Sequence, residues 1–303
     1  MFATENVLGA ATAAAELLGV ALALALGGGF VAMAVAVTSA RALIWIVALR
    51  QTRRWAGPTI RAAKPLPAGP LLAPAVGFML LPVVYAINLH GYVLLIGATF
   101  GTAILASFVA TRMLARLFDL FATLVFNSAF YEAAHLSKAQ RAKLNDVAAA
   151  ITLAVLLTGI GAWLTLMLLG SLVQRFWTFG ETVFDPIVAT LLLGGCVLRA
   201  VAAFPAAVLA SRNDHLPLCA SYLALSAAGL GGALCCAWLG GSIVVILIGA
   251  VLVEGAYAWL ALRKFLREAP AAGRSFLRRI FTRDSVAWLH RSLWQRRLNS
   301  AHV

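Results

Sequence analysis

Thr102 to Phe130 reads TAILASFVATRMLARLFDLFATLVFNSAF, an apolar stretch long enough to cross a bilayer that nevertheless contains charged residues. Arg112, Arg116 and Asp119 are spaced i, i+4 and i+7, so a helix places all three on one face. An ionisable side chain near the bilayer centre is costly unless it faces a protein interior or a wet cavity. The stretch therefore predicts a membrane helix with one face lining a cavity.

The composition also indicates a membrane protein. Of the 303 residues, 62% are hydrophobic and 12% are charged, and the mean hydropathy is +0.93. This leaves too little polar surface to cover a soluble globule. Met1 to Ala40 contains no Lys or Arg, so we expect no cleavable signal. The four cysteines fall in apolar stretches without metal-ligand spacing and indicate neither a zinc site nor disulfides.

Eight segments have the length that a membrane helix of about 20 apolar residues requires. They are residues 4–26, 30–49, 71–90, 102–128, 146–171, 185–210, 216–238 and 242–263. Gly27-Gly28-Gly29 and Leu239-Gly240-Gly241 indicate tight turns between the first pair and the last pair. The predicted fold class is an all-α polytopic membrane protein with about eight transmembrane helices.

A basic, proline-rich segment divides the chain. Gln51 to Pro70 contains four prolines, which is typical of an extended linker. We expect four parts: residues 1–50 with two helices, the linker 51–70, residues 71–264 with six helices, and a basic tail at 265–303. In the tail, Arg274 to Arg283 and Ser285 to Leu298 predict two short basic helices that adhere to anionic membrane lipids, with a disordered end as the alternative.

The basic residues predict the orientation. If the second, fourth, sixth and eighth segments end in the cytoplasm, nineteen of the 24 Lys and Arg lie on that side. Arg175 lies on the other side. The positive-inside rule then places both termini in the cytoplasm. The net charge of +13 is explained by orientation and anionic lipid, so we expect no nucleic-acid partner.

Two further arginines, Arg41 and Arg199, lie at membrane depth. The acidic residues clearly inside the segments are Glu16, Asp119 and Glu254. Arg41 and Arg199 are therefore either cavity residues or members of structural ion pairs, and the sequence leaves both alternatives open.

The charges also predict what the cavity binds. Asp119 can neutralise only one of Arg112 and Arg116, so the expected cavity is net positive and suited to an anion. Asn88 and His90 end the third segment and could line the cavity mouth, although capping of the helix end is the favoured interpretation for both. No catalytic motif or ligand spacing of histidines occurs, so we expect no enzyme, cofactor or metal site.

Three stretches resemble a known family. They are NLHGYVLLIGATFGTAILASFVATRMLARLFDL (Asn88 to Leu120), QRFWTFG (Gln174 to Gly180) and AAVLASRNDHLPLCASYLALSAAGLGGALCCAWLGG (Ala206 to Gly241). They resemble the C-terminal half of the O-antigen and polysaccharide flippases in the multidrug/oligosaccharidyl-lipid/polysaccharide exporter superfamily. In that family the first stretch includes a helix with a cationic residue in the central cavity. Residues 51–70 resemble the connection between the family's two six-helix lobes.

The resemblance implies a function. It implies a bacterial inner-membrane protein of cell-surface polysaccharide and lipopolysaccharide synthesis, which flips a polyprenyl-diphosphate-linked oligosaccharide. Two arginines one helical turn apart can hold diphosphate oxygens by charge-assisted hydrogen bonds. The candidate cavity residues are Arg112, Arg116, Asp119, Arg41, Arg199 and Asn88. The alternatives are a multidrug exporter of the same superfamily and a non-transporting membrane subunit of the polysaccharide assembly machinery.

The chain departs from the family in its N-terminal part. Members normally have two complete lobes, whereas only two segments precede the linker here. Residues 1–50 therefore predict an incomplete N-terminal lobe. Rocking of two matched lobes requires both, so a separately encoded N-terminal fragment is an expected partner, and a non-functional remnant is the alternative.

Overall fold

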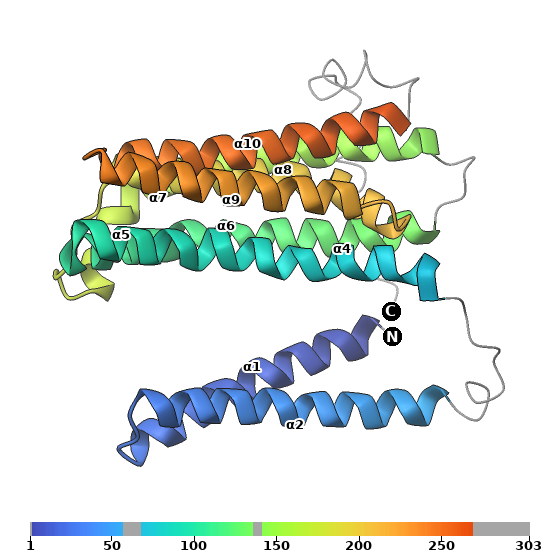
Figure 1. The fold of residues 1–303 in the computed structure, drawn as a ribbon, viewed down its shortest axis with the longest axis horizontal. Helices are drawn as coiled ribbons and strands as arrows, with labels where there is room; N and C mark the ends of the chain where they lie inside the picture. The colour runs from blue at the N-terminus through green and yellow to red at the C-terminus, as the bar shows by residue number, and fades with distance from the viewer. Residues whose placement is uncertain (1, 57–67, 136–140, 269–303) are drawn as a thin grey trace, which may run out of the picture. The chain divides into compact units, whose positions relative to one another are not determined.

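The computed structural model describes residues 2–56, 68–135 and 141–268, and these residues fold into helices without a β-strand (Figure 1). The chain divides into two compact units, Met1–Pro67 and Ala68–Val303. The division falls inside the proline-rich segment 51–70. The predicted all-α class is confirmed for the residues that the structure describes.

The first unit is a hairpin of two helices, α1 (Phe2–Ala25) and α2 (Phe30–Ala56). Gly27 joins them with a φ of +71°, a conformation that glycine adopts without strain. The Gly28 amide donates to the Ala23 carbonyl at 2.8 Å, which closes the end of α1. The predicted glycine turn is therefore confirmed.

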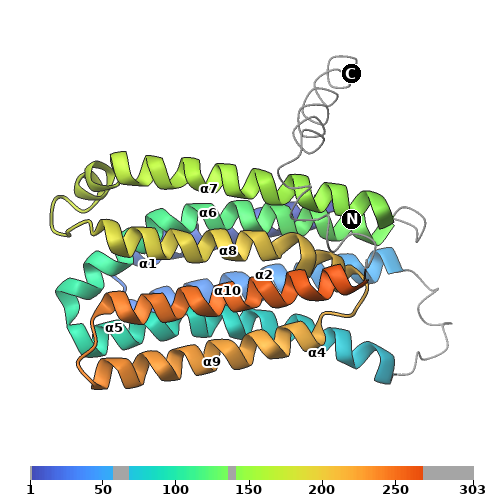
Figure 2. The same ribbon diagram turned by 90° about the horizontal axis from the view of Figure 1, so that it is seen from above.

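In the residues described, the second unit makes six passes of helix, of which the first is built from three consecutive segments. In chain order the elements are α4 (Ala68–Ala86), η1 (Ile87–Gly91), α5 (Tyr92–Phe100), α6 (Thr102–His135), α7 (Arg141–Trp177), α8 (Pro186–Ser211), α9 (Leu216–Trp238) and α10 (Ile243–Glu268). Figures 1 and 2 show the passes side by side, alternating in direction, as a bundle.

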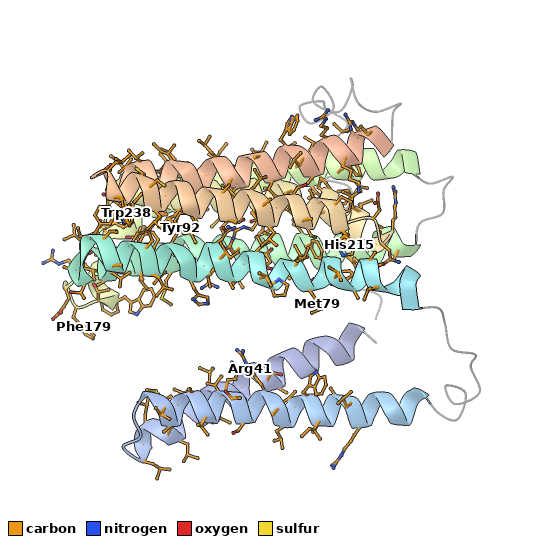
Figure 3. The ribbon with its side chains drawn as sticks, viewed as in Figure 1. Arg41, Met79, Tyr92, Phe179, His215 and Trp238 are labelled. Atoms are coloured by element: carbon orange, nitrogen blue, oxygen red, sulfur yellow. The ribbon has the colours of Figure 1, made fainter. Side chains whose placement is uncertain are left out.

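Each of the eight predicted segments coincides with helix. Six described helical stretches are long and apolar enough to cross a membrane: Val31–Arg50, Leu72–Phe100, Val147–Trp177, Pro186–Ser211, Leu216–Trp238 and Ile243–Arg267. The 34-residue helix α6 is long enough as well but carries the three charges of residues 102–130. Large apolar side chains such as Met79 and Trp238 are 70% and 84% exposed (Figure 3). Long apolar helices with apolar exteriors identify an all-α, multi-pass membrane protein.

Helix α8 is the centre of the second unit. It packs chiefly against α6 and α10, and Figure 2 shows it between them. Its second half is buried on every side and consists largely of alanine, including Ala202, Ala206 and Ala207. Small residues allow backbones to approach closely, which is the usual basis of helix packing in membranes. Side chains projecting from α8 therefore reach both neighbouring helices.

The ends of α8 are defined by the sequence. At its start, Oδ1 of Asp185 accepts hydrogen bonds from the amides of Ile187 and Val188 at 2.8 and 3.1 Å, a standard N-cap. At its end, Asn213 adopts a φ of +59° and the Asp214 amide donates to the Leu209 carbonyl at 3.0 Å. These bonds satisfy backbone groups that a helix terminus leaves free.

The second predicted glycine turn is confirmed as well. Gly240 has a φ of +77°, and the Gly241 amide donates to the Cys236 carbonyl at 2.8 Å. The same pattern closes α9 as closes α1, because both rely on glycine to reverse the backbone after the last helical turn.

Four predicted boundaries were wrong. The third segment does not end at residue 90, because η1 and α5 continue it to Phe100. The linker is helical at both ends, since α2 extends to Ala56 and α4 begins at Ala68, where Pro70 occupies the first turn and its missing amide is tolerated. Helix α10 extends to Glu268, beyond the boundary expected at residue 264. The two expected tail helices and residues 57–67 lie outside the described residues.

Candidate functional site

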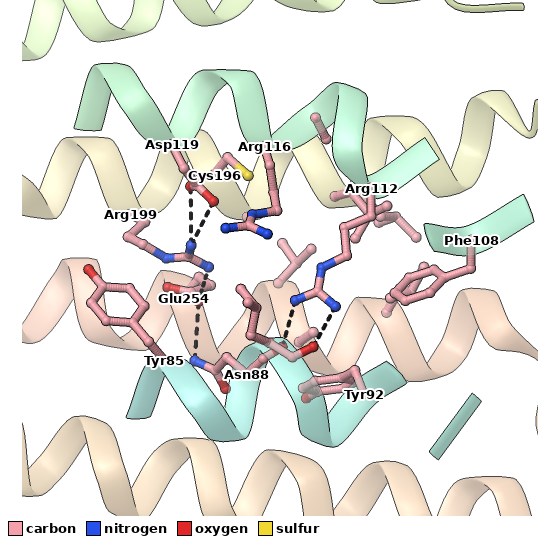
Figure 4. A pocket seen from close by; sticks show the side chains of 18 residues that line it. Tyr85, Asn88, Tyr92, Phe108, Arg112, Arg116, Asp119, Cys196, Arg199 and Glu254 are labelled. Carbon is pink, nitrogen blue, oxygen red and sulfur yellow. Dashed lines mark hydrogen bonds and ion pairs between the residues drawn. The ribbon is translucent and has the colours of Figure 1, made fainter. Parts of the chain in front are cut away.

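A buried ion-pair cluster lies between α6, α8 and α10. The guanidinium of Arg199 lies 3.1 Å from an oxygen of Asp119 and 2.6 Å from an oxygen of Glu254 (Figure 4). The three side chains come from three different helices. Arg199 is therefore shared by two carboxylates, and its positive charge is fully compensated.

A tyrosine and an asparagine hold Glu254 in place. The Tyr222 hydroxyl on α9 lies 2.8 and 2.9 Å from the two Glu254 oxygens. The Asn88 amide donates to the Tyr222 oxygen at 3.2 Å and lies 3.5 Å from Glu254. A buried carboxylate needs such partners because burial removes its hydration. Glu254 is thus an engaged structural anion.

Arg112 is held by backbone carbonyls of the first helical pass. Its two terminal nitrogens donate to the carbonyls of Leu89 and Asn88 at 2.6 and 3.2 Å, and its guanidinium lies 5.8 Å from the centre of the Phe108 ring. Both carbonyls belong to the π-helical turn Ile87–Gly91. Such turns are rare and often occur at functional sites. Neutral carbonyls orient Arg112 but leave its positive charge without an ion-pair partner among the described residues.

Arg116 has no hydrogen bond or ion pair with any described residue. It lies one turn after Arg112 on α6, and in Figure 4 its side chain extends into the space between Arg112 and Arg199. An arginine at this depth is costly unless water or a ligand is present. Because no described residue binds the Arg116 guanidinium, it can bind an anion.

These side chains line one cavity, which we name the central pocket. Its empty volume is about 690 Å³, including space open to solvent. The walls combine the charged cluster with aromatic and aliphatic side chains. The lining residues are Tyr85, Asn88, Leu89, Tyr92, Phe108, Arg112, Ala115, Arg116, Asp119, Leu191, Leu192, Gly195, Cys196, Arg199, Leu247, Ala250, Val251 and Glu254.

The pocket carries a net positive charge. Three arginines and two carboxylates line it, which leaves one positive charge in excess with all groups ionised. Arg199 and its two carboxylates together carry one net negative charge, whereas Arg112 and Arg116 carry two positive charges that neither carboxylate pairs with. Positive charge between low-dielectric walls attracts anions and excludes cations. The arrangement suits a phosphate or diphosphate group, whose oxygens two neighbouring guanidinium groups can bind.

Five of the six predicted cavity residues line the central pocket: Asn88, Arg112, Arg116, Asp119 and Arg199. Asp119 pairs with Arg199 on α8 and not with an arginine of its own helix. The end-capping interpretation of Asn88 and His90 was also wrong, because the helix continues through both.

Arg41 belongs elsewhere. It forms an ion pair with Glu16 in the first unit, with the guanidinium Nε and a carboxylate oxygen 2.5 Å apart (Figure 3). Of the two alternatives that the sequence left open for Arg41, the structure shows the ion pair. For Arg199 it shows both, since the residue is ion-paired and lines the pocket.

Sequence reasoning missed several pocket residues. Glu254 is an acidic residue within an apolar span, a pattern that marks functional positions, and it could have been included on that ground. Tyr85, Tyr92 and Cys196 carry no such signal, because tyrosine and cysteine are ordinary residues of apolar helices. Among the described residues, no group of three or more His, Cys, Asp or Glu is placed to hold a metal ion.

Comparison of the chain with known protein families, with curated proteins and with solved structures finds no match.

Proposed function

We propose that the chain is a flippase, or part of one, that moves a polyprenyl-diphosphate-linked oligosaccharide across the bacterial inner membrane for the synthesis of cell-surface polysaccharide. The observation that carries the proposal is the pair Arg112 and Arg116 in the central pocket, where neither guanidinium forms an ion pair with a described residue. The glycan and the lipid are taken from the sequence resemblance.

The chemistry of the pocket supports an anionic headgroup on a lipid. A diphosphate offers several oxygens, and each charge-assisted hydrogen bond to a guanidinium is stronger than a neutral one. The remaining wall is largely aliphatic, with Leu89, Leu191 and Val251 among its side chains. Such a wall can bury the first carbons of an isoprenoid chain, which is favourable because it removes apolar surface from water.

The cationic-drug exporter is the weaker alternative. A pocket for a cation needs an available carboxylate, but both carboxylates of the central pocket bind Arg199. The free charges are positive and repel a cationic substrate. The central pocket therefore favours an anion.

The proposed orientation follows the positive-inside rule. With nineteen of 24 basic residues on one side, both termini face the cytoplasm and the basic tail contacts anionic lipids. The cytoplasmic leaflet carries the anionic lipids that this tail would bind.

Binding of a fluorescent isoprenoid diphosphate to the purified full chain in nanodiscs tests the proposal. Arg112→Ala and Arg116→Ala should each weaken binding about tenfold or more, since a hydrogen bond to a charged group contributes roughly 1.5–3 kcal/mol. Arg263→Ala is the matched control, because Arg263 stacks on Trp259 and does not line the pocket. Unchanged binding by the double Ala variant would refute the proposal.

Export of glycan in cells separates transport from a passive role. Cells that depend on this chain should lose export with either Ala substitution while the protein still inserts into the membrane. Loss of isoprenoid diphosphate binding with full export would instead favour the non-transporting subunit.

A further inference from the structure

A second cavity adjoins the central pocket, and we name it the second pocket. Its empty volume is about 1040 Å³, again including open space. Its walls contain three aromatic side chains, three charged side chains and several aliphatic residues, and Thr123 and two of the aromatic residues carry hydroxyl groups. The lining residues are Leu81, Tyr85, Leu89, Arg116, Asp119, Ala122, Thr123, Phe126, Arg199, Ala203 and Tyr257.

The two pockets share one wall. Five residues line both of them: Tyr85, Leu89, Arg116, Asp119 and Arg199. The ion pair between Asp119 and Arg199 lies in this wall. The second pocket is therefore not a separate surface hollow but the space beyond the charged layer.

The positions of the remaining lining residues show the direction from one pocket to the other. On α6 the central pocket uses Phe108 and Arg112, whereas the second pocket uses Phe126, several turns further along. On α8 the order is Leu191 and then Ala203. On α10 the order is Leu247 and then Tyr257. On the first helical pass, which runs in the opposite direction, the second pocket uses Leu81 of α4 and the central pocket uses Tyr92 of α5. The pockets thus follow one another along the helix axes.

Two hydrogen-bond donors in the shared wall can bind a ligand. Arg116 lines both pockets and has no partner among the described residues. The Nε of Arg199 is buried and has no hydrogen-bond partner among them either. A buried donor without an acceptor is costly, and a ligand oxygen can satisfy it.

From these contacts we infer that the second pocket is a second subsite for the same phosphate-type anion, with Arg116 binding the anion from either side of the Asp119–Arg199 layer. This inference rests on the proposed function and extends it, because the headgroup then has two binding sites inside the second unit. The layer between them is the barrier that the headgroup must pass. Arg112 belongs to the central pocket alone, so the two arginines have different roles.

Protection of single cysteines from an anionic methanethiosulfonate reagent tests the inference on the purified full chain. One variant has Val251→Cys as its only cysteine, at a partly exposed position that lines the central pocket, because native Cys196 is buried. A second variant has Thr123→Cys, in the second pocket. A third retains Cys235, which is exposed and lines neither pocket, as the control. Inorganic diphosphate and farnesyl diphosphate are the probes, and farnesol controls for the lipid alone.

Either diphosphate should slow labelling at Val251→Cys and at Thr123→Cys but not at Cys235. If farnesyl diphosphate protects at lower concentrations than inorganic diphosphate does, the anion is lipid-borne. Protection of both pockets by either compound supports the second subsite. Protection of Val251→Cys alone refutes the second subsite and leaves the proposed function standing. Protection of neither cysteine refutes both proposals.

Arginine substitutions separate direct from indirect protection. Arg112→Ala should raise the protecting concentration about tenfold or more at Val251→Cys and leave it unchanged at Thr123→Cys, whereas Arg116→Ala should raise it about tenfold or more at both. Equal loss at both cysteines in Arg112→Ala would mean that the second pocket is protected only through the central one, and the inference would fail. Size-exclusion elution of each variant as the wild type confirms that the fold is retained.

Discussion

The guanidinium of Arg199 lies 2.6 Å from the carboxylate of Glu254, and this pair joins α8 to α10 at the wall of the central pocket. The Glu254 side chain is 6% exposed. Desolvated ion pairs are costly to create and more costly to break from one side only, because the remaining charge stays buried.

Arg199→Met should therefore destabilise the chain strongly, by about 3–5 kcal/mol, since it leaves the buried Glu254 and the partly exposed Asp119 without their cation. Tyr222→Phe, which removes one hydrogen bond to Glu254, should cost roughly 1 kcal/mol. Denaturant titration in detergent micelles measures both. Arg263→Met is the control for loss of an exposed arginine, and a cost equal to that of Arg199→Met would contradict the assignment.

Arg112 and Arg116 should differ in stability although both bind the anion. Arg112→Ala leaves the Leu89 and Asn88 carbonyls without their donor, so it should cost about 1–3 kcal/mol. Arg116→Ala removes a side chain without a described partner and should leave the unfolding midpoint unchanged or higher. The same denaturant titration in micelles measures the stability of both variants. A larger loss in Arg116→Ala would show that its side chain has a structural contact.

Acid should destabilise the second unit through His215. This residue precedes α9, and burial, followed by the nearby charge of Lys264, lowers its pKa below the ordinary value of 6.5. The folded state then binds fewer protons than the unfolded state at pH values just below 6.5. The stabilisation is complete above pH 6.5 and is lost as the pH falls toward the lowered folded-state pKa.

His215→Phe should remove this part of the pH dependence, because phenylalanine fills the same space without titrating. Thermal unfolding of wild type and variant between pH 8 and pH 5, a range of about three units around the histidine pKa, measures the difference. Parallel pH profiles would show that other groups cause the acid sensitivity.

Gly77 should tolerate no side chain. A Cβ at this position would lie 2.7 Å from Nε2 of His215 and 3.3 Å from the Cα of Leu216. Gly77→Ala must therefore displace the imidazole and should cost about 1–3 kcal/mol. Gly194 on α8 has open space within 4 Å of the position that a methyl group would occupy, so Gly194→Ala should be neutral or stabilising by up to about 1 kcal/mol. Similar costs at the two positions would contradict the close approach of α4 to His215.

Reporter fusions test the orientation that the positive-inside rule predicts. Alkaline phosphatase fused after Phe281 should be inactive, because that end is expected in the cytoplasm, and an insertion near Gly180 should be active. Expression of each fusion is checked by immunoblot. Activity at Phe281 and none at Gly180 would reverse the topology.

Local sequence is enough to predict the helices and the charged face of α6. Apolar length predicts each membrane segment, and glycine at Gly27 and Gly240 predicts the reversals, because these are properties of the local chain. The spacing of Arg112, Arg116 and Asp119 places them on one side of α6 for the same reason, since the helical period is fixed by the backbone.

The ion pairs, in contrast, follow only from the tertiary structure. The closest arginines to Asp119 in the sequence are on its own helix, yet it binds Arg199, 80 residues away. Arg41 looked equivalent to Arg199 in the sequence but pairs with Glu16 in the first unit. The helical period predicts which residues share a face of one helix. It does not predict which face of another helix packs against them. Partner choice depends on how distant helices pack, and that packing leaves Arg112 and Arg116 with positive charges that neither carboxylate of the central pocket pairs with.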